Sequence, residues 1–243
     1  MLFSAFVKTE ERPVFHKGAM TDKISPTIED YLMILFILQR DGEAVQGVRL
    51  AELLGVSPPT VTNTLKRMVR DGLVSMDSPH GPHLTDPGMA AARTVMRRHM
   101  LTEWLLSRML SWSKVHLQAH EIEHAISDEL EAALIADLNH PTTCPHGNPL
   151  PGFEDLAADW VSLVNLRPGD EVIIRRIHEL AEEDSQLLRF LEEKSVVPGS
   201  PARVVEVLPF NQTVTLEVHG QAVTLGFAAA QQVFAERLAP QTA

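Results

Sequence analysis

Apolar residues recur at helical spacing along the first two thirds of the chain and form short alternating runs in the last third. From Thr27 to the Asp41–Gly42 stop they recur every three or four residues, which predicts one helix. The same spacing returns at 88–110 and 114–138. After residue 166 the runs shorten, with turn sequences between them. The pattern predicts a mainly α protein with a small β domain (α+β).

The turns of the last third predict a small β-barrel, with a helix inserted from Asp184 to about Lys194 and another closing the chain. A Pro-rich connection at 140–151 precedes this part. Its Cys144 and His146 could bind metal, although a free cysteine is the preferred interpretation. The expected strands are Asp170–Ile174, Arg203–Val207, Thr213–Val218 and Gln221–Leu225.

The segment from Val48 to Val74 has the spacing of a helix-turn-helix. Gly55 suits a left-handed helix end, Ser57 suits an N-cap, and Pro58 falls in the first turn of the second helix, where a missing N–H costs little. Two short strands with a loop between them then predict a wing, and hence a winged helix-turn-helix.

The polar face of the second helix is expected to enter the major groove of DNA. Small side chains can contact thymine methyl groups, an asparagine can pair with a base edge, and basic side chains can contact phosphate. The alternative is a solvated helix face, and it applies most directly to Lys66. The predicted contacts are Ser57, Pro59, Thr60, Asn63, Lys66 and Arg67.

The two middle helices carry imidazole and carboxylate side chains on shared faces. A single histidine on an apolar face is usually a satisfied core residue, but several in register with acidic residues predict a metal site. The candidate ligands are His99 and Glu103 on the first helix and His116, His120, Glu123 and His124 on the second.

The spacing of these ligands predicts two sites. Along one continuous helix, His116 and His124 lie about 12 Å apart. Two metal–nitrogen bonds of about 2 Å each cannot span that distance. We therefore expect His116 to act with the first-helix pair, and His124 to act with His120 and Glu123.

The run His120–His124 also matches HExxH, the pattern of zinc-dependent proteases, and HxxEH, which would make His120 and His124 ligands and a glutamate the general base. The preceding winged helix and the second ligand pair argue against a metallohydrolase. A metal store without DNA binding is a third interpretation, for which the segment Val48–Val74 would be superfluous.

Composition places the acidic residues away from the predicted DNA-binding third. Residues 1–98 hold 12 basic and 11 acidic side chains, and the remainder holds 9 and 21, so the net charge of −11 arises in the last two thirds. No apolar run is long enough for a membrane span. The single cysteine and the absence of a signal-peptide pattern favour a cytoplasmic protein. Residues 1–22 are expected to form a flexible arm.

The chain resembles the diphtheria-toxin-repressor family of iron- and manganese-dependent regulators over about residues 24–240. Seven segments in the family's order make the resemblance specific. They are Ser25–Leu32, Val56–Thr62, Leu84–Gly88, Met96–Glu103, Val115–His116, Glu123–Glu129 and Cys144–Pro149.

The resemblance implies two metal sites per subunit. In iron-sensing members the position of Asp30 is Met and that of His120 is Cys, while manganese-sensing members carry Glu at the latter. The oxygen donor and the lack of sulfur favour Mn(II), with Fe(II) as the alternative because imidazole suits both. The implied primary site is Asp30, His120, Glu123 and His124, and the implied ancillary site is His99, Glu103, His116, Glu179 and Glu182.

The resemblance also implies a homodimer that binds a palindromic operator and represses metal-uptake genes, and it implies no catalytic residues. An iron-specific regulator of the same family is the main alternative. The expected domains are a winged helix-turn-helix (23–88), a helical metal-binding and dimerisation domain (89–160) and an SH3-like, FeoA-like domain (161–243).

Overall fold

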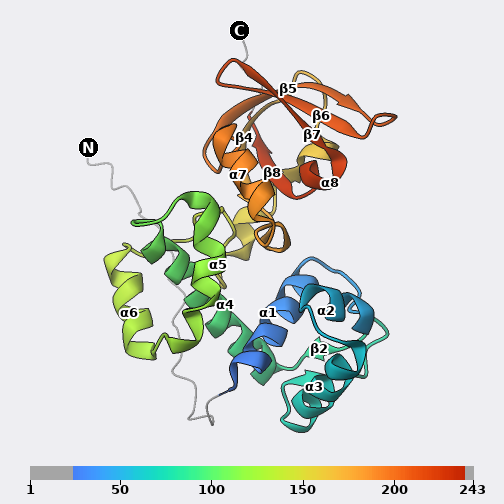
Figure 1. The fold of residues 1–243 in the computed structure, drawn as a ribbon, viewed down its shortest axis with the longest axis vertical. Coiled ribbons are helices and arrows are strands. Elements are labelled where there is room, and N and C mark those ends of the chain that lie inside the picture. The colour runs from blue at the N-terminus through green and yellow to red at the C-terminus, as the bar shows by residue number, and fades with distance from the viewer. Residues whose placement is uncertain (1–23, 239–243) are drawn as a thin grey trace, which may run out of the picture.

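The computed structural model describes residues 24–238, and the predicted N-terminal arm lies outside this range. Three parts follow one another, two helical and one β, with the β part at the opposite end of the molecule from helix α3 (Figure 1). The predicted α+β fold is confirmed. The first part comprises α1 (Pro26–Arg40), α2 (Gly47–Leu53), α3 (Pro58–Arg70), β1 (Val74–Ser75) and β2 (His83–Leu84).

Local sequence explains the helix-turn-helix and its wing. The Ser57 hydroxyl accepts a hydrogen bond from the Thr60 amide and so caps α3. Helix α3 buries Val61, Leu65 and Met68 and leaves its opposite face in solvent. Strands β1 and β2 pair antiparallel and form the predicted wing.

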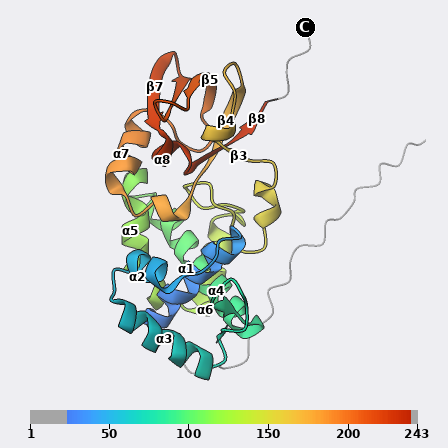
Figure 2. The same ribbon diagram turned by 90° about the vertical axis from the view of Figure 1, so that its right-hand side faces the viewer.

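The middle part is organised around α4 (Asp86–Leu106), which packs against α1 (Figure 2). The prediction of one helix over 114–138 is wrong, because the chain bends after His120 and restarts at the capping residue Ser127. Four short elements replace that helix: η1 (Trp112–Lys114), α5 (Val115–His120), η2 (Glu123–Ala125) and α6 (Asp128–Asp137).

The last part is a six-stranded antiparallel sheet in the order β3-β8-β4-β5-β6-β7. The four expected strands and the inserted helix are confirmed, but the closing helix is a single turn followed by a strand. The elements are η3 (Glu154–Ala157), β3 (Val161–Ser162), η4 (Leu163–Asn165), β4 (Glu171–Ile177), η5 (Glu179–Ala181), α7 (Ser185–Glu193), β5 (Pro201–Leu208), β6 (Thr213–Val218), β7 (Gln221–Gly226), α8 (Phe227–Ala230) and β8 (Val233–Arg237).

Among the described residues, two large hydrophobic cores and a small cluster of Leu106, Val115 and Ala119 hold the molecule together. One joins the two helical parts, and the other fills the β part. The Pro-rich loop lies between them: the Ile177 amide of β4 donates to the His146 carbonyl, and a Cβ on Gly147 would meet the Arg175 carbonyl oxygen at 1.8 Å. This close approach holds the loop against the sheet. Within residues 24–238, no helix has the length and apolar character needed to cross a bilayer.

Candidate metal centre

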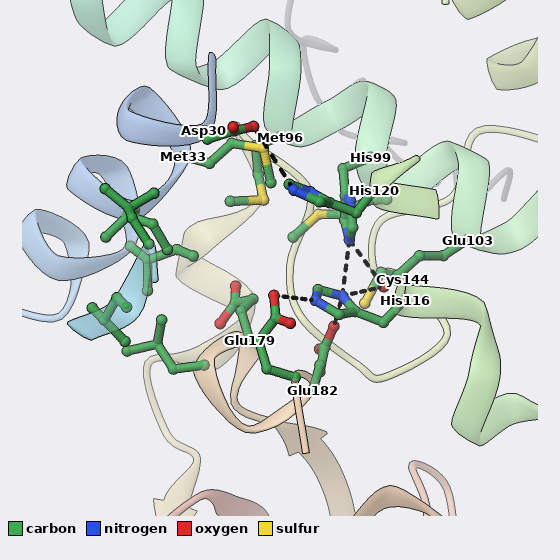
Figure 3. A pocket seen from close by; sticks show the side chains of 17 residues that line it. Asp30, Met33, Met96, His99, Glu103, His116, His120, Cys144, Glu179 and Glu182 are labelled. Atoms are coloured by element: carbon green, nitrogen blue, oxygen red, sulfur yellow. Dashed lines mark hydrogen bonds and ion pairs between the residues drawn. The ribbon is translucent and has the colours of Figure 1, made fainter. Parts of the chain in front are cut away.

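A cavity of about 330 Å³ lies where α1, α4, α5 and the turn after β4 meet (Figure 3). Apolar residues of α1 and α2 form one wall, including Ile34, Ile37 and Leu53. Imidazole, carboxylate and thiol groups form the other wall. These polar side chains gather into two neighbouring clusters.

The first cluster joins α1 to the turn after α5. Nε2 of His124 lies 3.3 Å from Oδ1 of Asp30 and 3.8 Å from Oε1 of Glu123. His120 lies beside both acids, with Nδ1 at 3.2 Å from Glu123 and Nε2 at 3.8 Å from Asp30. All four residues predicted for the primary site therefore come together, although different nitrogens of His120 face the two acids.

Two carboxylate oxygens of this cluster have imidazole nitrogens as their close polar neighbours. Within residues 24–238, Oδ1 of Asp30 and Oε1 of Glu123 are buried and make no hydrogen bond. A buried carboxylate oxygen without a hydrogen bond is costly. Both atoms point into the region where the imidazoles converge, so the donor set fits a divalent cation, which would satisfy both oxygens at once.

Glu29 is a contact of this cluster that the sequence analysis missed. Its Oε2 lies 2.5 Å from Nδ1 of His124, opposite the nitrogen that faces Asp30. A carboxylate can only accept a hydrogen bond, so this contact places the proton on Nδ1 and leaves Nε2 free as a ligand. The adjacent acidic residues Glu29–Asp30 were the available signal.

The second cluster brings together His99, Glu103, His116 and Glu182, all buried, with donor atoms within 4.8 Å of one another. Nδ1 of His116 lies 3.0 Å from Glu103 and 2.8 Å from Glu182. Nε2 of His99 lies 3.0 Å from that same nitrogen and 3.1 Å from Glu103. So many lone pairs converging on one point suit a cation.

His146 and Cys144 extend the second cluster. Both were named from the sequence as possible ligands, with a free cysteine as the preferred interpretation. Nε2–H of His146 donates to the Trp112 carbonyl, so Nδ1 faces Glu103 and Glu182 at 3.4 Å each. The Cys144 sulfur forms a group with Glu103 and His146. Burial raises the pKa of this thiol, and the two acids raise it further, so the uncharged thiol is favoured until a cation arrives.

Glu179, predicted as an ancillary ligand, does not reach the second cluster. Its carboxylate accepts hydrogen bonds from Arg40 and Arg176 instead. The neighbouring Glu182 faces His116, and Glu183 lies 3.3 Å from the other nitrogen of that imidazole. The turn η5 sends these side chains in different directions, which helical spacing cannot predict.

Buried charges control protonation in both clusters. Burial alone would lower the pKa of His99, but Glu103 and Glu123 outweigh burial and raise it to about 9. Burial opposes ionisation of Glu123, yet His120 and His99 lower its pKa to about 2. Burial raises the pKa of Glu182, and the nearby charge of Glu103 raises it further. Glu123 therefore holds a negative charge and His99 a positive one, and a cation would take the place of the proton on the imidazole.

His99 connects the two clusters. Its Nδ1 contacts Glu123 of the first cluster, and its Nε2 contacts Glu103 and His116 of the second. The two predicted sites consequently share one imidazole ring rather than standing apart.

The predicted DNA contacts lie together on the solvent face of α3. All of them are exposed, and none takes part in the hydrophobic core. They are Ser57, Pro59, Thr60, Asn63, Lys66 and Arg67.

An exposed helix-turn-helix beside buried clusters of candidate metal ligands is typical of a metal-responsive DNA-binding protein, and comparisons identify the family. Three family models match in succession: the iron dependent repressor N-terminal DNA binding domain (residues 23–81), the iron dependent repressor metal binding and dimerisation domain (85–152) and the FeoA domain (161–237). The chain belongs to the diphtheria-toxin-repressor family of metal-dependent, DNA-binding transcriptional repressors.

Relatives cover most of this chain and nearly all of their own length. The iron-dependent repressor IdeR of Mycobacterium leprae is 38% identical over 218 residues, 81% of this chain and 94% of its own. The diphtheria toxin repressor of Corynebacterium diphtheriae is 34% identical over 212 residues, 82% and 92% of the two chains. A solved manganese-dependent transcriptional repressor in complex with manganese is 32% identical, with a TM-score of 0.74 over 87% of this chain and 100% of that one.

These relatives are repressors, so the chain is a regulator and not an enzyme. The metallohydrolase alternative also lacks structural support. The helix that HExxH requires ends at His120, and Glu121, which would serve as the base, is exposed.

Proposed function

We propose that this repressor is activated when divalent cations bind both clusters and fix the DNA-reading head relative to the dimerisation part. The observation that carries the proposal is the convergence of Asp30, on α1 of the head, with Glu123 and His124, on η2 of the middle part. A bound cation would neutralise the negative charges of Asp30 and Glu123 and so hold the two parts together. Its loss would leave the head free to move, so metal shifts the population toward the DNA-competent arrangement.

Two cations per chain are supported by the division of the donor groups. The first site would use Asp30, His120, Glu123 and His124, with Glu29 orienting His124. The second would use His99, Glu103, His116 and Glu182, with His146 and Cys144 beside them. Glu179 is left out of this ligand set because both of its oxygens are held by arginines.

Mn(II) is the proposed activator, with Fe(II) as the competitor. Two carboxylates and no thiolate in the first cluster suit a hard cation, while the imidazoles suit either ion. The related proteins are divided in the same way, since one is named iron-dependent and another manganese-dependent. The natural target would be a promoter of metal-uptake genes with a palindromic operator, read by the two heads of a homodimer.

The test is fluorescence anisotropy of labelled operator DNA with the full-length protein, titrated with Mn(II), Fe(II) and Zn(II). The wild type should bind tightly only with metal. Asp30→Ala should lose this metal response while remaining a dimer, because Asp30 is the only α1 ligand in the proposed first site. A drop of at least about 100-fold is expected, near the upper range of coupling between sites.

Glu121→Gln is the matched control, since this acid lies on the same turn as the ligands but is exposed. It should behave as the wild type does. If Asp30→Ala still binds operator tightly only with Mn(II), the proposed role of the first cluster is wrong.

A further inference from the structure

Glu179 lies at the centre of a buried charge network between α1 and the β part, close to but separate from the metal clusters. Arg40, the last residue of α1, donates to both oxygens of Glu179, at 2.5 and 2.9 Å. Arg176 on β4 donates to the same carboxylate at 2.7 Å. The carboxylate is 6% exposed and Arg176 is 8% exposed, so water scarcely screens these pairs.

A second acid completes the network. Asp41, directly after α1, accepts from Arg40 and from Nε2 of His178 at 2.6 Å. The Leu180 amide donates to the other nitrogen of His178, which places the proton on Nε2. Two arginines and two acids thus balance their charges across the boundary between the head and the β part. We name Arg40, Asp41, Arg176, His178 and Glu179 the interdomain clasp.

The clasp is joined to the second metal cluster by hydrogen bonds. Nε of Arg176 donates to Oδ1 of Asn148, which fixes the orientation of that amide. Its Nδ2 then donates to Oε1 of Glu182 at 2.5 Å, while Oε2 of Glu182 lies 2.8 Å from His116. Asn148 is fully buried. A continuous polar path therefore runs from the cluster to the end of α1.

We propose that Glu179 is a positioning residue and not a metal ligand: the interdomain clasp holds α1 on the β part and links the second metal cluster to the DNA-reading head. Ordering Glu182 on a cation orders Asn148 and Arg176, and these hold Glu179 where Arg40 meets it. The inference rests on the proposed metal activation, and it extends that function by adding a connection through the β part, independent of Asp30.

The test compares Arg40→Gln with Glu179→Gln in the full-length protein. Both variants should bind as many Mn(II) ions per chain as the wild type in equilibrium dialysis. Both should lose about tenfold of the metal-dependent gain in DNA affinity, a typical coupling between sites. The double variant should lose no more than either single one, because the two residues act as a pair.

Two further variants separate the clasp from general damage to the fold. Arg40→Lys keeps the charge and should recover part of the loss. Arg175→Gln changes the neighbouring arginine of β4, whose half-exposed side chain pairs with Glu236 of β8, and should change nothing. Hydrogen exchange of residues 36–43 should be faster in Arg40→Gln and Glu179→Gln, with or without metal.

Loss of one Mn(II) from Glu179→Gln alone would make Glu179 a ligand and overturn the inference. Wild-type DNA affinity and exchange in both variants would overturn it as well. The wild-type titration decides the proposed function separately. If the wild type shows no metal response, both metal activation and the clasp's link to metal are wrong. Hydrogen exchange of residues 36–43 would then still show whether the clasp holds α1 on the β part.

Discussion

At the scale of single residues, the two proposed metal clusters hold protons that a cation would displace. The acids of the clusters raise the pKa of His99 to about 9, and those around His116 raise its pKa well above the ordinary value, in both cases against the effect of burial. Imidazole binds a metal only when the coordinating nitrogen is unprotonated. Near neutral pH the metal-free protein therefore holds imidazolium groups where a cation would bind, and metal and protons compete.

Mn(II) binding should consequently release protons at pH 7 and strengthen as pH rises toward 9. Each displaced proton steepens the rise in apparent affinity by about tenfold per pH unit. The folding stability of the metal-free protein should instead fall as pH rises. The stabilisation from the raised pKa of His99 is complete below about 6.5, its unfolded value, and is lost as pH rises through about 9. Titration calorimetry in two buffers of different ionisation enthalpy measures the proton release, and an identical heat in both buffers would contradict it.

At the scale of elements, residue spacing correctly predicted the features that lie on regular helices. The ligands on α4 and the exposed face of α3 follow from helical periodicity. The break after His120 was missed, although Ser127 followed by Asp128 and Glu129 is a helix-start signal, and the Ser127 hydroxyl does cap α6. Spacing did not predict that His146 joins the second cluster or that Glu179 turns to arginines while Glu182 faces His116, because loops and 3-10 turns orient side chains without a period.

The Pro-rich loop provides a prediction at this scale. Gly147 has a φ of +88° and faces the Arg175 carbonyl, whereas Gly152 has a φ of +102° and open space around it. Gly152→Ala should cost only the conformational strain, about 1–2 kcal/mol. Gly147→Ala should add the clash, about 1–3 kcal/mol more, and should weaken metal binding because His146 moves with the loop. Urea denaturation of both metal-free variants measures the difference, and equal losses would show that the loop is not held as tightly as described.

At the scale of the whole molecule, the exposed face of α3 and the β-sheet lie far apart. The winged head lies at one end and the β part at the other (Figure 1). The middle part connects them, and the family model that matches it is a dimerisation domain. Large apolar side chains exposed on α5, α6 and the turn between them are Leu117, Ile122 and Leu130. A second copy of the chain would cover such residues and place two α3 helices on one DNA duplex.

Ile122→Glu should therefore produce a monomer. Its side chain is 40% exposed in the single chain, and burial of a carboxylate there against a partner would raise the dimer dissociation constant by at least about 100-fold. Each chain should still bind its full complement of Mn(II), since Ile122 offers no donor atom, but operator affinity should fall. Phe210→Glu is the control, because this residue is 88% exposed at the end of the β5–β6 hairpin. Analytical ultracentrifugation measures the oligomeric state of both variants. A dimeric Ile122→Glu, or a monomeric Phe210→Glu, would show that the dimer interface does not lie at the turn after α5.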